Sequence, residues 1–163
     1  MAGYYEYLVS SLPMLHFGAK PPFSYEKFLE MCSGLISERD MDILKEAPLA
    51  KWKEFDIALR NELVKIRASR KHVDPVKYLR KDGYADPSIS HIALNAHRAK
   101  SIIEAEKTLD RERWNFLDEI TIGHYFDIDF LITYSLKLII MERWARVKAG
   151  DKVRLLDEVL VAS

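Results

Sequence analysis

The stretch Trp114–Trp144, WNFLDEITIGHYFDIDFLITYSLKLIIMERW, indicates the fold more clearly than any other part of the chain. Its centre, Phe130–Met141, contains twelve residues, of which only Lys137 is charged. Apolar residues lie on nearly every side of a helical wheel, so a helix here must be buried almost all round. The stretch therefore predicts a core helix, with Asp127 as its N-cap.

Length and composition place this helix in a globular protein. The chain has 163 residues, is 48% hydrophobic and 31% charged, and can bury a sizeable core without disulfides or metals. Its one cysteine, Cys32, favours a reducing cytoplasm and a place in the core. Lys plus Arg equals Asp plus Glu at 25 each, so no overall charge attracts nucleic acid.

Further helix signals precede and follow the core helix. In the longest one, Trp52, Phe55, Leu59, Leu63 and Ile66 form one apolar stripe. The other expected helical segments are Ser24–Cys32, Ser37–Glu46, Asp74–Arg80 with its end at Asp82-Gly83, Ile89–Leu109, a stretch around Trp114 and Leu117, and Asp151–Leu160 after Gly150. The longest runs from Leu49 to about Arg70.

The N-terminal stretch differs from these segments. Tyr4–Leu15 mixes aromatic and β-branched residues, which favours a short strand or an extended arm. The fold class predicted is all-α: a compact multi-helix domain of about seven helices with a short extended N-terminal arm. We expect a single helical domain over 1–163, with the arm and a loop over 1–23 and the helical body over 24–163.

The sequence contains no arrangement typical of catalysis. The five histidines are scattered, and none has the spacing of a metal ligand pair on one helical face. Asp127 and Asp129 have the residue type of a general acid/base pair, but capping of the following helix explains Asp127 without catalysis. We therefore expect a protein that is not an enzyme, with no catalytic, cofactor-binding or metal-binding residues.

One segment is locally basic. Its basic residues between positions 60 and 80 are Arg60, Lys65, Arg67, Arg70, Lys71, Lys77 and Arg80, against Glu62 and Asp74. A solvated, partly self-neutralised surface explains this 60–80 basic face, and so does a contact surface for an acidic protein partner. Lys137 has similar alternatives: it extends to solvent, pairs with a carboxylate or faces a partner.

No segment is expected to span a membrane. The longest apolar run covers only about 18 Å as a helix, against a hydrocarbon core of roughly 30 Å. The N-terminus lacks the basic leader of a signal peptide and carries Glu6. These features indicate a cytoplasmic protein.

Two blocks of sequence resemble known proteins. Tyr4–Cys32, YYEYLVSSLPMLHFGAKPPFSYEKFLEMC, resembles the start of short bacterial proteins whose genes lie among those for V/A-type ATPase subunits. Leu117–Trp144, LDEITIGHYFDIDFLITYSLKLIIMERW, is similar both to that family and to a helix of the V-type ATPase C subunit, called the d subunit in eukaryotes. We refer to them below as the N-terminal block and the C-terminal block.

The resemblance implies a function without bond chemistry. The C subunit is an all-helical funnel that sits on the membrane rotor ring and receives the central shaft of a proton- or sodium-transporting ATPase. The chain is then expected to be C-subunit-like, with central-stalk and membrane-ring subunits as partners, on the cytoplasmic membrane face. Whether the chain forms a homodimer is left open by the sequence. The resemblance identifies no individual contact residue; we expect partner binding at the turn and helix edges near His124, Tyr125, Asp129, Lys137 and Trp144.

Overall fold

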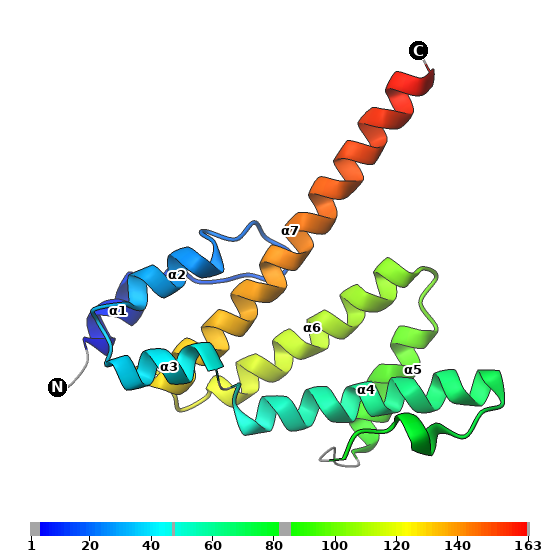
Figure 1. Cartoon of the computed structure of the whole chain (residues 1–163), viewed down its shortest axis with the longest axis horizontal. Helices are drawn as coiled ribbons and strands as arrows, with labels where there is room; N and C mark the ends of the chain where they lie inside the picture. Colours follow the sequence, from blue (N-terminus) through cyan, green and yellow to red (C-terminus); the bar gives the residue numbers. More distant parts are fainter. Residues whose placement is uncertain (1–3, 47, 82–85, 163) are drawn as a thin grey trace. The chain divides into compact units, whose positions relative to one another are not determined.

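The computed structural model of the chain describes residues 4–46, 48–81 and 86–162, without the side chains at 155 and 162. All regular elements in these ranges are helical, which confirms the all-α prediction (Figure 1). They are α1 (Tyr5–Ser11), α2 (Tyr25–Cys32), α3 (Glu38–Glu46), α4 (Ala50–Lys71), the 3₁₀-helix η1 (Pro75–Tyr78), α5 (Pro87–His97), α6 (Ile102–Thr121) and α7 (Ile128–Ala162). The predicted helix end at Asp82-Gly83 lies outside the described residues.

The helices divide into two compact units. Unit 1 contains Met1–Ala47 and Gly123–Ser163, whereas unit 2 is the continuous segment Pro48–Ile122. Unit 1 therefore joins the two ends of the chain. The single domain over 1–163 stays a prediction.

Unit 1 is built on the first half of α7. Leu131, Tyr134 and Leu138 of α7 are buried, and so are Leu8 of α1 and Phe28 of α2 in the same unit. Tyr134 stacks on Phe28 with ring centroids 5.2 Å apart. The prediction of a buried helix over Phe130–Met141 is correct for most of its positions.

The prediction of a strand or an extended arm at the N-terminus is wrong. Residues Tyr5–Ser11 form α1 instead of a strand or an extended arm. Local β-propensity is a weak preference, and burial overrides it because a helix places Leu8 entirely inside the core. The hydroxyl of Tyr5 donates a hydrogen bond to Asp40 Oδ2 of α3 at 2.7 Å, which fixes the helix on unit 1.

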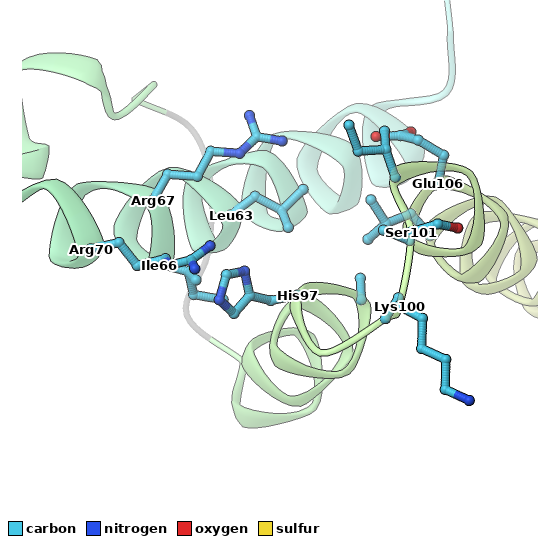
Figure 2. A pocket seen from close by; sticks show the side chains of 13 residues that line it. Leu63, Ile66, Arg67, Arg70, His97, Lys100, Ser101 and Glu106 are labelled. Atoms are coloured by element: carbon cyan, nitrogen blue, oxygen red, sulfur yellow. The ribbon is translucent and has the colours of Figure 1, made fainter.

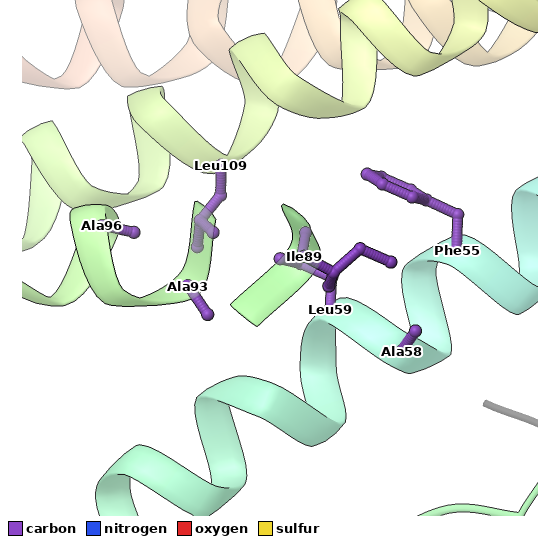
Figure 3. Packing of buried hydrophobic residues seen from close by; sticks show 7 residues of the cluster. All are labelled: Phe55, Ala58, Leu59, Ile89, Ala93, Ala96 and Leu109. Atoms are coloured by element: carbon purple, nitrogen blue, oxygen red, sulfur yellow. The ribbon is translucent and has the colours of Figure 1, made fainter. Parts of the chain in front are cut away.

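Unit 2 is a three-helix layer formed by α4, α5 and α6. The stripe expected on α4 is present, and its residues pack with small side chains of α5 around Leu109 of α6 (Figure 3). The buried residues of this cluster are Phe55, Ala58, Leu59, Ile89, Ala93, Ala96 and Leu109. Alanines at the contact let the helix backbones approach closely.

Two predicted helix boundaries are wrong. The segment Ile89–Leu109 is interrupted between α5 and α6, and the stretch around Trp114 belongs to α6. Ser101 starts this helix, because its hydroxyl accepts a hydrogen bond from the Glu104 N–H while the Glu104 carboxylate accepts one from the Lys100 N–H. This capping box was a legible signal in the sequence.

The prediction of a separate last helix is also wrong. Asp151–Leu160 is the continuation of α7, which runs through Gly150 without a break. A glycine inside a helix costs only about 1 kcal/mol, and good helix formers surround this one. Positive φ is found at Gly18, Gly34 and Gly123, which lie between helices and not within them.

Candidate functional site

The turn that leads into α7 holds three of the five predicted partner-binding residues. His124 Nδ1 lies 2.6 Å from Asp127 Oδ2 and 3.5 Å from Asp129 Oδ2. Asp127 Oδ1 accepts a hydrogen bond from the Phe130 N–H at 3.0 Å, as expected for an N-cap. Gly123 has φ +87°, so the chain turns sharply just before His124. The result is a half-exposed polar cluster at the start of α7.

Two aromatic side chains stand beside this cluster. Tyr125 is 63% exposed and Phe126 is 52% exposed. Exposed aromatic side chains next to polar groups are frequent in protein interfaces, where they supply apolar area at low entropic cost. Phe126 was missed in the sequence because a Phe beside a core helix is usually a core residue. We call His124–Asp129 the α7 entry turn.

Lys137 and Trp144 lie elsewhere on α7. Measured along the helix, Lys137 is about 12 Å and Trp144 about 22 Å beyond Asp129. Both side chains are half-buried. The five predicted residues therefore do not form one patch: His124, Tyr125 and Asp129 gather at the entry turn, while the other two belong to the packed length of α7.

The packed length of α7 is held by the N-terminal block. The Tyr25 N–H donates to Glu142 Oε1 at 3.0 Å, and Lys148 Nζ donates to the carbonyl of Gly18 at 2.9 Å. The Tyr134 hydroxyl donates to the carbonyl of Pro13 at 2.8 Å. Burial raises the pKa of Tyr134, which keeps this hydroxyl protonated as a donor.

The residues of the 60–80 basic face lie in different surroundings in the structure. Arg60 Nε lies 2.8 Å from Asp56 Oδ2, and Lys65 Nζ lies 2.6 Å from Glu62 Oε1, so both are paired within α4. Arg67 and Arg70 instead border a cavity of about 370 Å³. Arg67 also borders a second cavity of about 360 Å³, together with Arg80.

The first cavity combines an apolar floor with a basic rim (Figure 2). Leu63 and Ile66 of α4 face the start of α6, and the rim carries the two arginines and His97. The Lys100 side chain points away from the cavity in Figure 2. His97 was not predicted for this surface because the sequence placed it inside one long helix.

A buried ion-pair network lies beside the second cavity. Arg113 Nη1 lies 2.9 Å from Asp110 Oδ1, and its Nε lies 3.1 Å from Asp56 Oδ1. Asp110 is fully buried, and Arg113 is 12% exposed. Asp56 also pairs with Arg60, so two arginines and two aspartates form one chain of contacts. A buried carboxylate in such a network is a structural feature that holds α4 to α6.

Among the described residues, no group of three His, Cys, Asp or Glu side chains has a geometry that could hold a metal ion. No helix in the described ranges combines the length and apolar character needed to cross a membrane.

Comparison with known protein families finds a match to part of the chain. A family model described as "Protein of unknown function (DUF2764)" matches residues 87–157, which is less than half of the chain. The match includes α5, α6, the entry turn and most of α7. No curated protein and no solved structure matches the chain.

Proposed function

We propose that this chain is a non-catalytic subunit or accessory protein of a bacterial V/A-type rotary ATPase, resembling the C subunit and acting between the central shaft and the membrane ring. One observation carries the proposal: the two blocks that resemble ATPase-associated proteins, Tyr4–Cys32 and Leu117–Trp144, meet in one compact unit. Most of each block belongs to unit 1. A resemblance that falls mostly in one folded unit is more informative than two unrelated segments.

The contacts between the blocks support this interpretation. Phe28 of the N-terminal block stacks on Tyr134 of the C-terminal block, and Tyr25 bonds to Glu142. Residues of both blocks are thus needed to form this packed surface. A helical unit held in this way supplies shape and stiffness, which are the properties that torque transmission requires of a connecting protein.

The α7 entry turn is the contact surface in this proposal. Its exposed Tyr125 and Phe126 offer apolar area, and His124, Asp127 and Asp129 offer polar groups for specificity. Small apolar centres with polar rims are the usual arrangement of protein interfaces. The proposal assigns no catalytic role to the His124–Asp127 contact, because capping explains Asp127.

The proposal is tested by affinity purification of the tagged full chain from detergent-solubilised membranes of its own cells, with partners identified by mass spectrometry. We expect central-stalk and ring subunits in stable ratio. The double variant Tyr125→Ala with Phe126→Ala should lose them at unchanged helicity. Tyr7→Ala removes a similarly exposed aromatic from α1 and serves as the control.

Two results would count against the proposal. Purification of the wild-type protein without any of the ATPase subunits contradicts the function itself. Equal recovery by wild type and the double variant contradicts only the assignment of the contact to the entry turn, and the Lys137→Glu, Trp144→Ala variant then tests the packed length of α7.

A second candidate function is favoured by the first cavity of unit 2. Arg67 and Arg70 form no ion pair with a described residue, and they stand over the apolar side chains of Leu63 and Ile66. This combination fits an acidic, partly apolar segment of a protein partner. The chain would then be a helical adaptor that binds through the 60–80 basic face.

Salt dependence separates the two candidates. Binding through Arg67 and Arg70 should weaken strongly as ionic strength rises, since exposed charges are screened over about 10 Å at 0.1 M salt. The variant Arg67→Glu with Arg70→Glu should abolish it. Lys51→Glu with Lys53→Glu makes the same charge change on the same helix and is the matched control. Binding that resists salt and tolerates the arginine variant excludes the adaptor.

A further inference from the structure

The last part of α7 continues beyond the body of unit 1. The helix has 35 residues, which gives a length of about 52 Å. Hydrogen bonds join α7 to the N-terminal block at Glu142, which accepts from Tyr25, and at Lys148, which donates to Gly18. From Ala149 to Val161 the described side chains are exposed, apart from a half-buried Asp151. Figure 1 shows this part of α7 extending past α1, α2 and α3.

This exposed part carries an apolar stripe with a heptad pattern. Ala149, Val153, Leu156 and Leu160 follow one another at spacings of four, three and four residues. Val153 is 58% exposed, Leu156 is 63% exposed and Leu160 is 71% exposed. We call these four residues the C-terminal stripe. In heptad notation Ala149 and Leu156 occupy d positions, and Val153 and Leu160 occupy a positions.

The pattern specifies a kind of partner. Val at a with Leu at d favours two parallel strands in a coiled coil over larger assemblies. An exposed helix with such a stripe gains most by packing against a helix with the same pattern, because each knob then meets a hole of matching size. A second copy of this chain supplies that helix.

The charges beside the stripe favour the same arrangement. Lys152 occupies position g and Asp157 occupies position e of the next heptad, so they flank the stripe on opposite sides. Neither forms an ion pair with a described residue, whereas their neighbours Asp151 and Arg154 pair with each other at 3.5 Å. In a parallel pair of helices, g of one chain faces this e of the other.

We propose that two copies of this chain associate through a short parallel coiled coil formed by the C-terminal stripe, with Lys152 of each copy facing Asp157 of the other. In an antiparallel pair g meets g and e meets e, and the complementarity between Lys152 and Asp157 is lost. Lys148 occupies an outer c position, and its contact with Gly18 therefore leaves the stripe uncovered. The inference does not depend on the proposed function.

The seam is short, so the dimer is weak and depends on concentration. Four apolar layers bury far less than the roughly 1,200 Å² at the lower limit of stable interfaces. A covalent trap is therefore the sharpest test. Cys32 is fully buried, and burial raises its pKa to about 12, so the native thiol does not compete in mild oxidation.

The trap uses the full chain with one added cysteine. Leu156→Cys, and separately Ala149→Cys, should each form a disulfide-linked dimer on oxidation, because d positions of a parallel pair face their own copies. Arg154→Cys places a thiol on the outer side of the same turn and is the control. All three sites are exposed, so the variants should fold. Equal cross-linking at all three positions, or none at Leu156→Cys, overturns the proposal.

Charge exchange tests the direction of the helices. Lys152→Glu and Asp157→Lys should each weaken dimerisation about tenfold in sedimentation equilibrium, since each turns two attractions into two repulsions. The double variant Lys152→Glu with Asp157→Lys should restore wild-type association. Failure of this rescue overturns the parallel arrangement, and a wild-type chain that stays monomeric up to millimolar concentration overturns the dimer.

Discussion

Unit 1 and unit 2 are both helical, but they are held together in different ways. In unit 1 the connecting hydrogen bonds join residues very far apart in sequence: Tyr134 to Pro13 across 121 positions and Lys148 to Gly18 across 130. In unit 2 the pair Arg113 and Asp56 spans 57 positions. Closing longer loops costs more entropy, so unit 2 is expected to form before unit 1.

The chemistry of the two cores differs as well. Unit 1 buries a thiol and tyrosine rings: burial raises the pKa of Cys32 to about 12, and it also raises the pKa values of Tyr25 and Tyr134. Unit 2 buries the carboxylate of Asp110 against Arg113. Neutral groups in one unit and ion pairs in the other should respond differently to substitution and to pH.

The largest effect is expected in the ion-pair network. Arg113→Met removes the cation 2.9 Å from the fully buried Asp110 carboxylate and keeps a similar side-chain volume. Breaking a buried pair from one side costs about 3–5 kcal/mol. We expect the loss in unit 2 alone, seen as faster hydrogen exchange in α4–α6 with unchanged exchange in the first half of α7.

The matched control is Arg60→Met in the same network. The Arg60 side chain is 50% exposed, and exposed pairs contribute at most about 1 kcal/mol. If the two variants destabilised unit 2 equally, burial would not be what makes the network important. If Arg113→Met accelerated exchange in both units, the inferred difference in how the two units are held together would be wrong.

Alkaline pH should have the next largest effect, and it should act on unit 1. The protonated thiol of Cys32 is favoured in the folded state, so its contribution is complete below its ordinary pKa of 9.0 and is lost as the pH rises towards about 12. Tyr134 and Tyr5, whose pKa values are also raised, act in the same direction. Each pKa unit corresponds to about 1.4 kcal/mol, so a loss of a few kcal/mol is expected.

Hydrogen exchange measured at increasing pH after correction for intrinsic rates reports the two units separately. Unit 1 should open first, because the buried thiol and phenol groups whose pKa values are raised all belong to it. Cys32→Val should make the pH dependence of unit 1 shallower. Earlier opening of unit 2 would contradict the assignment.

The sequence predicted the stripe on α4 in unit 2 but not the conformation of α1 in unit 1, and the reason is physical. The stripe on α4 is local, and its 3.6-residue period can be read without knowing the partner. The conformation of Tyr5–Ser11 depends on Asp40 and on the core around Leu8, which are tertiary partners that no local pattern shows. The capping box at Ser101 was legible but was masked by the continuous apolar face of Ile89–Leu109.

The same limit applies to the candidate sites: a local pattern can be read from the sequence, but a tertiary partner cannot. His124 and Asp129 were predicted for the contact surface because they flank a turn that the sequence shows, and their role stays a prediction. Trp144 and Lys137 were grouped with them although a helix separates residues by 1.5 Å per position. His97 joined the basic rim only through a break between α5 and α6, and the partners of Asp110 required the fold.

The smallest effect concerns the hydrogen bond that ties the N-terminal block to α7. Tyr134→Phe removes the donor to the Pro13 carbonyl at 2.8 Å but keeps the ring that stacks on Phe28. A single hydrogen bond of this kind contributes about 1 kcal/mol. Urea unfolding should show that loss, and exchange should increase in the loop from Leu15 to Gly18. Tyr125→Phe removes a hydroxyl from a 63% exposed ring and should change neither quantity. Equal stability of Tyr134→Phe and wild type would mean that ring packing alone joins the two ends of the chain, and the long-range hydrogen bond would not distinguish unit 1 from unit 2.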